Sequence, residues 1–531
     1  MAAPSIEHNL AHFTLRGPAR SPQRVALSGR EAGGRTVRVT YAELEDQANR
    51  IAAWLRARGL GIGSRIVVLV PMSIAFYAIV MGATQVGASC VFLDPWSGRE
   101  QLDAACAMAR PDAFFGVPRA HLLRLVSPAF RAIPHHVRVG PGFWGRPFRR
   151  MLERTAPDPA IAPVTPDHVA SIAYTTGSTG RPKPVRRTHG HVIEMLAHLD
   201  ARRAMRPDDV QMAPWPVMLF DPLCHGRGAV IPDFPPGRIA EADPGVLIEQ
   251  MREGGVTVLT GPPALYESLL AHLEPSGALL PLRLAFVGGS LVSRVLLQRI
   301  QDRLPPGAQA AAAYGSTEVE PIAVLTAEEA RDVPDVDGVC VGTVHPDLDL
   351  RLVLRHEGPI VLGEAGWSGW EVAPGERGEI VVAGPHVSID YADDPVAFAE
   401  NKIREPGGRV WHRTGDTGHL DTAGRLHLTG RLSAIVQTVG GPLFPFPVER
   451  RFREVVGVRD ACLVGYESRA WVVVEPEDGV DPQALLARLE PLRAELGLDA
   501  LAWHPRMPRD LRHNSKVELA RLREWLSRRP S

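Results

Sequence analysis

Lysine is nearly absent from this sequence of 531 residues. Of its 59 basic residues only three are lysines, Lys183, Lys402 and Lys516, and the others are arginines. An ammonium group is a compact point charge, whereas a guanidinium group is a planar fork, so the two are not interchangeable in a reactive site. Each retained lysine is therefore a candidate for chemistry that arginine does not perform.

The sequence also lacks paired cysteines and an excess of charge of one sign. Its five cysteines are scattered without a CxxC pair, which argues against a zinc site or a disulfide framework and fits a reducing cytosol. A formal net charge of −1 gives no indication of binding to nucleic acid or to an anionic membrane. Residues 1–13 contain no basic region followed by an apolar run, so we expect no signal peptide and a cytoplasmic location.

Charged side chains are missing from residues 66–93, a stretch long enough to span a bilayer. Pro71, Gly82 and Gly87 interrupt it, however, and divide it into a strand, a helix and a second strand. A buried strand–helix–strand unit accounts for the low polarity without a membrane. We therefore expect no integral membrane segment.

Short β-rich apolar runs alternate with amphipathic helical segments along the chain. Residues 40–59 are predicted to form a helix, with Thr40 as its N-cap and Gly59 at its end. This alternation is typical of parallel sheets with helices on their faces, and the length of the chain requires two or more domains. We predict strands near 65–70, 256–261, 282–289, 308–315, 461–465 and 470–475, and a terminal helix from about residue 516.

Residues 174–183 read YTTGSTGRPK and follow a predicted strand. Glycine lets backbone N–H groups turn toward an anion, the Ser and Thr hydroxyls add donors, and Lys183 adds a mobile positive charge. The pattern indicates a phosphate-binding loop, although it is not the GxxxxGK[ST] loop of the P-loop NTPases. A plain Gly/Ser linker is the alternative, which the fixed Pro182 and Pro184 disfavour.

Four motifs in order resemble those of the adenylate-forming superfamily, which includes acyl-CoA synthetases, nonribosomal-peptide adenylation domains and luciferases. They are YTTGSTGRPKPV (174–185), YGSTE (314–318), HRTGDTGHLDTAGRLHLTGR (412–431) and RHNSKVELARL (512–522). The resemblance covers nearly the whole chain. It implies an α/β fold with a large N-terminal domain of stacked α/β subdomains and a β-rich subdomain, residues 1–430. A small mobile α+β domain, residues 431–531, would follow a hinge at 430–433.

The resemblance also implies substrates and site residues. ATP and Mg²⁺ would be bound, and the carboxylate of a small-molecule acid would attack the α-phosphate. Thr317 would contact the α-phosphate, and the hard oxygen of Glu318 would hold Mg²⁺. Lys516 would stabilise the transferring charge. The pyrophosphate end would be bound by Thr175, Thr176, Gly177, Ser178, Thr179, Gly180 and Lys183, and the adenosine by Gly288, Gly289, Ser290, Tyr314, Gly315, Asp416 and Arg431.

Alternatives remain open for several of these residues. Glu318 and Arg431 also fit a solvated surface, and Tyr314 also fits a buried core. For Lys402, a tethering role near the hinge and a plain surface position are equally compatible with the sequence.

Several stretches resemble a narrower branch, the β-lactone synthetases of bacterial olefin biosynthesis. They are THGHV (188–192), PWPVMLFDPLCHGRG (214–228), AENKIREPGGRVWHRTGD (399–416), GRLSAIVQTVGGPLFPFPVE (430–449) and MPRDLRHNSK (507–516). In that branch a 3-hydroxy acid is adenylated, and its own hydroxyl then closes a four-membered lactone. His189 or His191 is a candidate base for this hydroxyl, and the alternative is that both histidines are structural.

Two other functions remain open. An acyl-CoA ligase or amide-forming ligase in secondary metabolism would transfer the acid to a thiol or an amine, alongside partner enzymes of a biosynthetic pathway. A catalytically inactive relative would act as a binding module, which the retention of Lys183, Glu318, Asp416 and Lys516 disfavours.

Pro184 stands where the superfamily normally has glycine after the lysine, and it removes a backbone donor. We expect the acid pocket to include residues 218–226 and 260–270.

Overall fold

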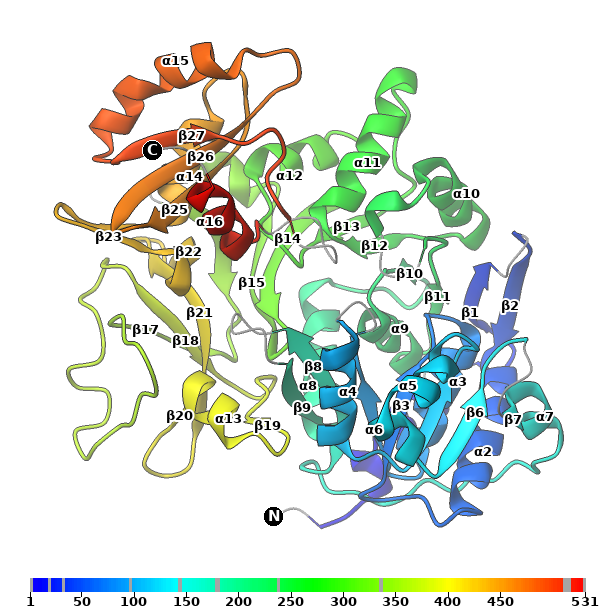
Figure 1. Cartoon of the computed structure of the whole chain (residues 1–531). Helices are drawn as coiled ribbons and strands as arrows, with labels where there is room; N and C mark the ends of the chain where they lie inside the picture. Colours follow the sequence, from blue (N-terminus) through cyan, green and yellow to red (C-terminus); the bar gives the residue numbers. More distant parts are fainter. Residues whose placement is uncertain are drawn as a thin grey trace.

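The structure is a computed structural model of the chain. It describes residues 3–17, 21–30, 34–94, 98–141, 146–176, 182–235, 239–333, 338–509 and 517–528. Two large sheets with helices between and around them form the body of the molecule, and a smaller C-terminal part lies at one end (Figure 1).

The smaller of the two large sheets has eight strands in the described part of the chain. Its middle strands are parallel, and an antiparallel pair, β8 with β9, lies near one edge. In sheet order the strands are β19 (Asp390–Tyr391), β9 (Pro182–Thr188), β8 (Val169–Thr176), β4 (Ser89–Phe92), β3 (Arg65–Leu69), β5 (Ala113–Gly116), β6 (His135–Arg138) and β7 (Arg146–Pro147).

The larger sheet changes character along its width. One part is antiparallel: β17 (Asp349–Val353), β18 (Gly378–Ala383), β21 (Val410–Leu420), β22 (Arg425–Arg431), β16 (Val339–Val344) and β15 (Val319–Thr326), with β20 (Lys402–Arg404) beside β21. The other part is mostly parallel: β14 (Gln309–Ser316), β13 (Leu284–Val287), β12 (Val258–Gly261), β10 (Val210–Met212), β11 (Gly228–Val230), β1 (Val25–Arg30) and the antiparallel edge strand β2 (Thr36–Thr40).

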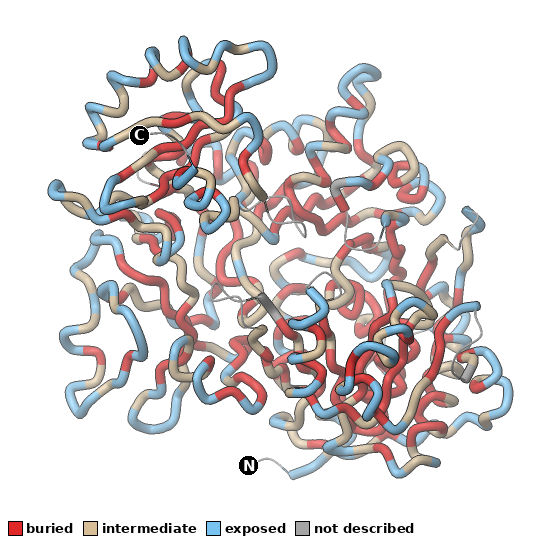
Figure 2. The backbone as a smooth tube through the Cα atoms, viewed as in Figure 1, coloured by how far each residue is buried: buried red, intermediate tan, exposed pale blue. Residues whose placement is uncertain are grey.

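Helices pack between the two large sheets and fill the main core. One hydrophobic cluster contains Ile66 and Val68 from the smaller sheet together with Leu27 and Phe286 from the larger sheet. The helices that contribute to it include α1 (Leu10–Arg16), α2 (Tyr41–Arg56), α3 (Ile74–Gln85), α8 (His189–Arg202) and α9 (Phe220–Cys224). Figure 2 shows buried residues running through the strands and these inner helices, while the outer helices are exposed on their far faces.

Local sequence explains the start of α2. The Thr40 hydroxyl accepts the backbone N–H of Glu43, and the Glu43 carboxylate accepts the backbone N–H of Thr40, as a capping box requires. Residues 66–93 form β3, α3 and β4, so the expected strand–helix–strand unit is confirmed. α3 is apolar on all sides and lies inside the molecule. Among the described residues, no helix combines the length and the apolar character that crossing a bilayer requires.

The outer helices cover the remaining faces. They include α4 (Arg99–Ala109), α10 (Pro244–Gly254), α11 (Pro263–Leu273), α12 (Arg294–Gln301) and α13 (Pro395–Asn401). The predicted strands at 65–70, 256–261, 282–289 and 308–315 correspond to β3, β12, β13 and β14, so these expectations are confirmed within a few residues.

After Arg431 the chain builds separate sheets with their own hydrophobic clusters. β23 (Val436–Thr438) pairs with β24 (Gly441–Leu443), and β25 (Val458–Tyr466), β26 (Arg469–Pro476) and β27 (Ala500–Trp503) form a second sheet. The helices are α14 (Pro445–Arg453), α15 (Pro482–Glu495) and α16 (Leu519–Ser527), of which the last begins three residues beyond the expected position. The α/β class with a β-rich part and a smaller C-terminal part is thus confirmed, while the exact boundary at 430/431 stays a prediction.

Candidate active site

The turn between β14 and β15 presents the YGSTE motif. Ser316 pairs with Val319 across this hairpin, so Thr317 and Glu318 lie at its tip. The Ser316 hydroxyl caps the turn, because it accepts the Glu318 N–H at 3.2 Å and donates to the Glu318 carboxylate at 3.2 Å. The hairpin therefore fixes a carboxylate at its end instead of leaving it mobile.

Glu318 is held from a second direction by the segment that precedes α13. The Tyr391 hydroxyl donates to its carboxylate at 2.8 Å, and the Ser388 N–H donates to its carbonyl at 2.6 Å. Burial raises the pKa of Glu318, but the basic groups of His412 and Lys402 and the Tyr391 hydroxyl outweigh that effect and lower it to about 2. Glu318 is therefore ionised at neutral pH, and its oxygens have lone pairs beyond the two hydrogen bonds.

Lys402 is buried, so the surface position that the sequence left open is wrong. Its ammonium group donates to the Ser388 carbonyl and lies 5.3 Å from the centre of the Tyr391 ring. Burial lowers the pKa of Lys402 to about 8, against the opposing attraction of Glu318 and Asp390. Because Ser388 and Tyr391 are also the residues that hold Glu318, Lys402 tethers the segment that positions the carboxylate.

His412 and Asn401 extend this polar cluster toward β9. The His412 Nδ1 atom lies 3.3 Å from the Asn401 carbonyl, and burial lowers the pKa of His412 to about 3. The Asn401 side-chain oxygen accepts a hydrogen bond from the Lys183 ammonium group at 3.1 Å. Two of the three lysines are thus linked through one short segment, Asn401–Lys402.

The predicted phosphate loop is only partly described. β8 and β9 bracket it, with Thr175 opposite Lys183 and Thr176 opposite Pro182. Gly177, Ser178, Thr179 and Gly180 lie outside the described residues, and so does Lys516. The Pro184 carbonyl accepts the Ala392 N–H at 2.8 Å, so the residue that departs from the superfamily pattern joins β9 to the segment that holds Glu318.

Tyr314, Asp416 and Arg431, predicted for the adenosine end, come together from three strands. The Tyr314 hydroxyl donates to the Asp416 carboxylate at 2.8 Å, and the Arg431 Nε atom lies 3.0 Å from the other Asp416 oxygen. Burial and the neighbouring Asp416 charge raise the pKa of Tyr314. Arg431 is half exposed yet paired, so its carboxylate partner is oriented before any ligand arrives.

The GGS segment (288–290) follows β13 and passes close beside β14. Gly289 has φ of +80°, and a Cβ atom at this position would come within 2.7 Å of the Trp215 ring. A Cβ atom at Gly288 would meet the Ala313 carbonyl oxygen at 3.2 Å. Glycine is therefore needed for the backbone to lie between Trp215 and the strand that carries Tyr314 and Gly315.

Both candidate bases lie at the start of α8 and are buried. The His189 Nδ1 atom accepts the Leu10 N–H at 3.0 Å, which ties α1 to α8. Burial lowers the pKa of His189 to about 4 and that of His191 to about 3, so both rings are neutral at neutral pH. The bond to Leu10 is the kind of structural role that the sequence left open for His189.

The sequence did not single out Arg187, Ser388, Tyr391 or His412. The buried Arg187 guanidinium group donates to the Thr317 carbonyl at 2.6 and 3.2 Å and so fixes the tip of the β14–β15 turn. A signal was available for two of them, because Arg187 precedes the THGHV segment and His412 begins the HRTGD motif.

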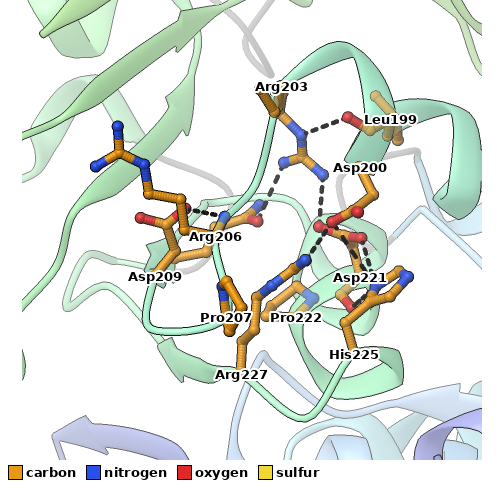
Figure 3. Close-up of polar contacts among 12 residues, drawn as sticks. Leu199, Asp200, Arg203, Arg206, Pro207, Asp209, Asp221, Pro222, His225 and Arg227 are labelled. Atoms are coloured by element: carbon orange, nitrogen blue, oxygen red, sulfur yellow. Dashed lines mark hydrogen bonds and ion pairs between the residues drawn. The ribbon is translucent and has the colours of Figure 1, made fainter. Parts of the chain in front are cut away.

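A buried polar network supports residues 218–226, the segment expected in the acid pocket (Figure 3). The Arg203 guanidinium group and the Asp221 carboxylate are both fully buried and lie 2.6 Å apart. Arg227 pairs with Asp200, and a hydrogen bond to Asp221 raises the pKa of His225. Both carboxylates are already paired with guanidinium groups. The network therefore holds α9 against α8 and does not offer a ligand site. That the segment lines a pocket stays a prediction.

Comparison with known proteins bears on the chemistry of this arrangement. Residues 15–392 match the AMP-binding enzyme family. The chain is 34% identical to the olefin beta-lactone synthetase of Stenotrophomonas maltophilia (strain K279a), over 95% of this chain and 96% of that protein. It is 29% identical to the feruloyl-CoA synthase of Amycolatopsis sp, over 90% of this chain and 91% of that protein. The crystal structure of ATP-bound MatB from Rhodopseudomonas palustris has the same fold, with a TM-score of 0.80, 23% identity and coverage of 98% and 99%.

Proposed function

Because this chain belongs to the AMP-binding enzyme family, we propose that it is an AMP-forming ligase that converts a 3-hydroxy acid into a β-lactone. ATP would be consumed, with AMP and pyrophosphate as the other products. The observation that carries the first half of the proposal is the preformed Tyr314–Asp416–Arg431 group on the same sheet as the Glu318 turn. The second half rests on the identity of 34% with an olefin beta-lactone synthetase across both chains.

In the first step, a carboxylate oxygen of the acid would attack the α-phosphorus of ATP, and the bond to pyrophosphate would break. Negative charge increases around phosphorus, so fixed donors and cations must be aimed there. The Asp416 carboxylate would accept hydrogen bonds from the ribose hydroxyls. Tyr314 would face the adenine, and Thr317 would contact the α-phosphate. Lys183 and the hydroxyls of 175–179 would bind the leaving pyrophosphate, and Lys516 would approach the reacting carboxylate.

Glu318 fits a magnesium ligand, because it is an ionised hard-oxygen donor with lone pairs to spare. Bound Mg²⁺ would supply charge neutralisation for the phosphate oxygens. The protein's own contribution is to hold this carboxylate still. Tyr391, Ser316 and Ser388 fix its position, and His412, Lys402 and the Tyr391 hydroxyl together lower its pKa.

In the second step, the β-hydroxyl oxygen would attack the activated carbonyl carbon. A C–O bond closes the ring, AMP leaves with the electrons of its bond to the carbonyl, and the hydroxyl proton passes to a base. The nucleophile is tethered, and well-oriented intramolecular attack contributes about 7–11 kcal/mol toward lowering the barrier. Of the two candidate bases we favour His191, because the Nδ1 atom of His189 is already bound to the Leu10 N–H.

An acid–CoA ligase is the second candidate, and the resemblance to feruloyl-CoA synthase favours it. One experiment separates the two. The full chain is incubated with ATP, Mg²⁺ and a 3-hydroxy acid without CoA, and products are identified by mass spectrometry. We expect AMP and a lactone of the acid's mass minus water. The matched acid without the 3-hydroxyl should give adenylate but no lactone. AMP formation that requires CoA, with a thioester as product, would overturn the proposal.

A further inference from the structure

Three histidines from distant parts of the sequence meet beside the Glu318 hairpin. His198 lies on α8, His345 follows β16, and His386 lies between β18 and β19. One nitrogen of each ring lies within 4.8 Å of the corresponding nitrogens of the other two, and the ring centres are 4.4–4.9 Å apart. His345 and His386 are buried, at 4% and 0% exposure.

One of the rings already has the kind of hydrogen bond that orients a metal-binding histidine, and a second ring lies beside a carboxylate. The His386 Nε2 atom lies 3.0 Å from the Pro321 carbonyl, and the His198 Nδ1 atom lies 3.4 Å from the Asp347 carboxylate. The opposite nitrogens, His386 Nδ1 and His198 Nε2, are buried and have no hydrogen-bond partner among the described residues. Metal-binding histidines usually donate their second ring N–H to a carbonyl or carboxylate, which leaves the other nitrogen for the metal.

The third ring needs the largest adjustment. The His345 Nδ1 atom accepts the Asp347 N–H at 3.2 Å and lies 3.9 Å from the Asp347 carboxylate. His345 can bind a metal in two ways. Its Nδ1 atom can give up the hydrogen bond from the Asp347 N–H and bind the metal itself, or Nδ1 can carry the ring proton and donate it to the Asp347 carboxylate, which leaves Nε2 for the metal. Ligand nitrogens of a tetrahedral zinc site lie about 3.4 Å apart, so the present spacing has to close by about 1.4 Å at most.

The charges around the cluster also suit a cation. Burial lowers the pKa of His345 and lowers that of His386 to about 4, so both rings are neutral at neutral pH, which is the form that binds metals. The Asp347 carboxylate lies 3.4 Å and the Glu194 carboxylate 3.7 Å from His198 nitrogens. Arg202 is the opposing positive charge, and it acts on His345.

We propose that His198, His345 and His386 form a divalent-metal site, with Zn²⁺ as the preferred ion and Asp347 as the carboxylate that orients the rings. Such a site would be structural. Pro321, whose carbonyl contacts His386, is three residues beyond Glu318, and Ser388, two residues beyond His386, donates to the Glu318 carbonyl. The ion would therefore join α8 to the segments that contact β15 and the tip of the Glu318 hairpin. The scattered cysteines argue against a thiolate site but do not bear on a histidine site.

The test uses the full chain, treated with a chelator and titrated with Zn²⁺ and, separately, Co²⁺. We expect one equivalent of each to bind, the visible bands of four- or five-coordinate Co²⁺, and a Tm several degrees higher with Zn²⁺. His345→Ala should abolish all three effects. Asp347→Asn should weaken binding about 10- to 100-fold, as expected for loss of an orienting carboxylate.

His121→Ala is the matched control, because His121 is also buried and contacts a carbonyl, that of Val137, through Nε2 at 3.2 Å. It should leave binding unchanged. If His345→Ala does not fold, His198→Cys decides: its Co²⁺ complex should gain a thiolate charge-transfer band in the near ultraviolet. If the wild-type chain binds neither ion, the three rings only pack together. The same conclusion follows if His345→Ala still binds the metal and the Co²⁺ complex of His198→Cys lacks the thiolate band. None of these readouts depends on lactone formation, so they are independent of the proposed activity.

Discussion

Lys402 and Glu318 act on each other through one short segment of chain. The Lys402 ammonium group binds the Ser388 carbonyl, and the N–H of the same Ser388 donates to the Glu318 carbonyl at 2.6 Å. The charge of Lys402 also helps to lower the Glu318 pKa to about 2. Lys402 thus contributes to both the position and the ionisation of the proposed metal ligand.

Lys402→Met should therefore raise the pKa of Glu318. Burial raises this pKa, and the variant lacks one of the positive charges that lower it. In the wild type, a Glu318 pKa of about 2 places its protonation below the working range. In the variant, the acid limb of kcat/KM for adenylate formation should move upward in pH, as followed by pyrophosphate exchange. Lys402→Arg, which keeps the charge, is the control. An acid limb that stays in place in Lys402→Met would contradict the coupling.

Asp416→Ala should weaken ATP binding about 10- to 100-fold, because hydrogen bonds to a charged group contribute about 1.5–3 kcal/mol each. The variant loses the proposed ribose acceptor and the partner of both Tyr314 and Arg431. Tyr314→Phe removes only one orienting bond and should cost about tenfold or less. The KM for ATP and direct nucleotide binding measure both effects. Equal losses in the two variants would indicate that Asp416 acts only by holding the tyrosine.

Lys516→Ala should lower adenylate formation by about 10²–10³-fold, the usual effect of removing one group that stabilises developing charge. Turnover of a chemically prepared acyl-adenylate should change much less, since that step follows pyrophosphate release. Lys516→Arg should not restore the first step, because a planar guanidinium replaces a compact charge poorly. Single-turnover measurements of the two half-reactions check this. An equal loss in both would assign Lys516 another role.

Gly430→Ala should destabilise the junction with the C-terminal part by about 1–3 kcal/mol. Gly430 has φ of +142°, and an added Cβ atom would come within 2.6 Å of the Pro445 ring. Gly424→Ala is the matched control: Gly424 also has positive φ, at +76°, but its Cβ atom would meet open space. Thermal unfolding should show a larger loss for Gly430→Ala. If the two variants lose the same stability, the contact with Pro445 does not account for the loss in Gly430→Ala.

Asp221→Ala should destabilise the protein by about 3–5 kcal/mol, because it leaves the Arg203 guanidinium group buried without its carboxylate. Replacing both, Arg203→Met with Asp221→Leu, should recover much of the loss, since the Arg203 charge is then no longer buried without its carboxylate. Asp158→Ala removes an ion pair with Arg56 that is partly exposed, and it should cost about 1 kcal/mol or less. Chemical unfolding measures all three. A double variant no more stable than Asp221→Ala would contradict this view.

Local signals predicted the regular elements well. Thr40 and Glu43 form the cap that starts α2, and the breaks at Pro71 and Gly87 bound α3 within the uncharged stretch. These features depend on residues that are neighbours along the chain, so composition and spacing are enough to find them. The motifs also singled out Glu318 and Asp416, which the structure places at the tip of the β14–β15 hairpin and within β21. The chemical roles predicted for both residues stay predictions.

Contacts between distant segments could not be predicted in the same way. The burial of Lys402, the approach of Arg187 to Thr317 and the meeting of His198 with His345 and His386 all depend on how β15, β16 and β21 align with α8 and with the chain before α13. The sequence alone determined which chemical groups this protein has and which of its elements are helices and strands. The tertiary structure alone decided which groups share a buried, low-dielectric environment, because strand register and helix packing are set by the sum of contacts over the whole core.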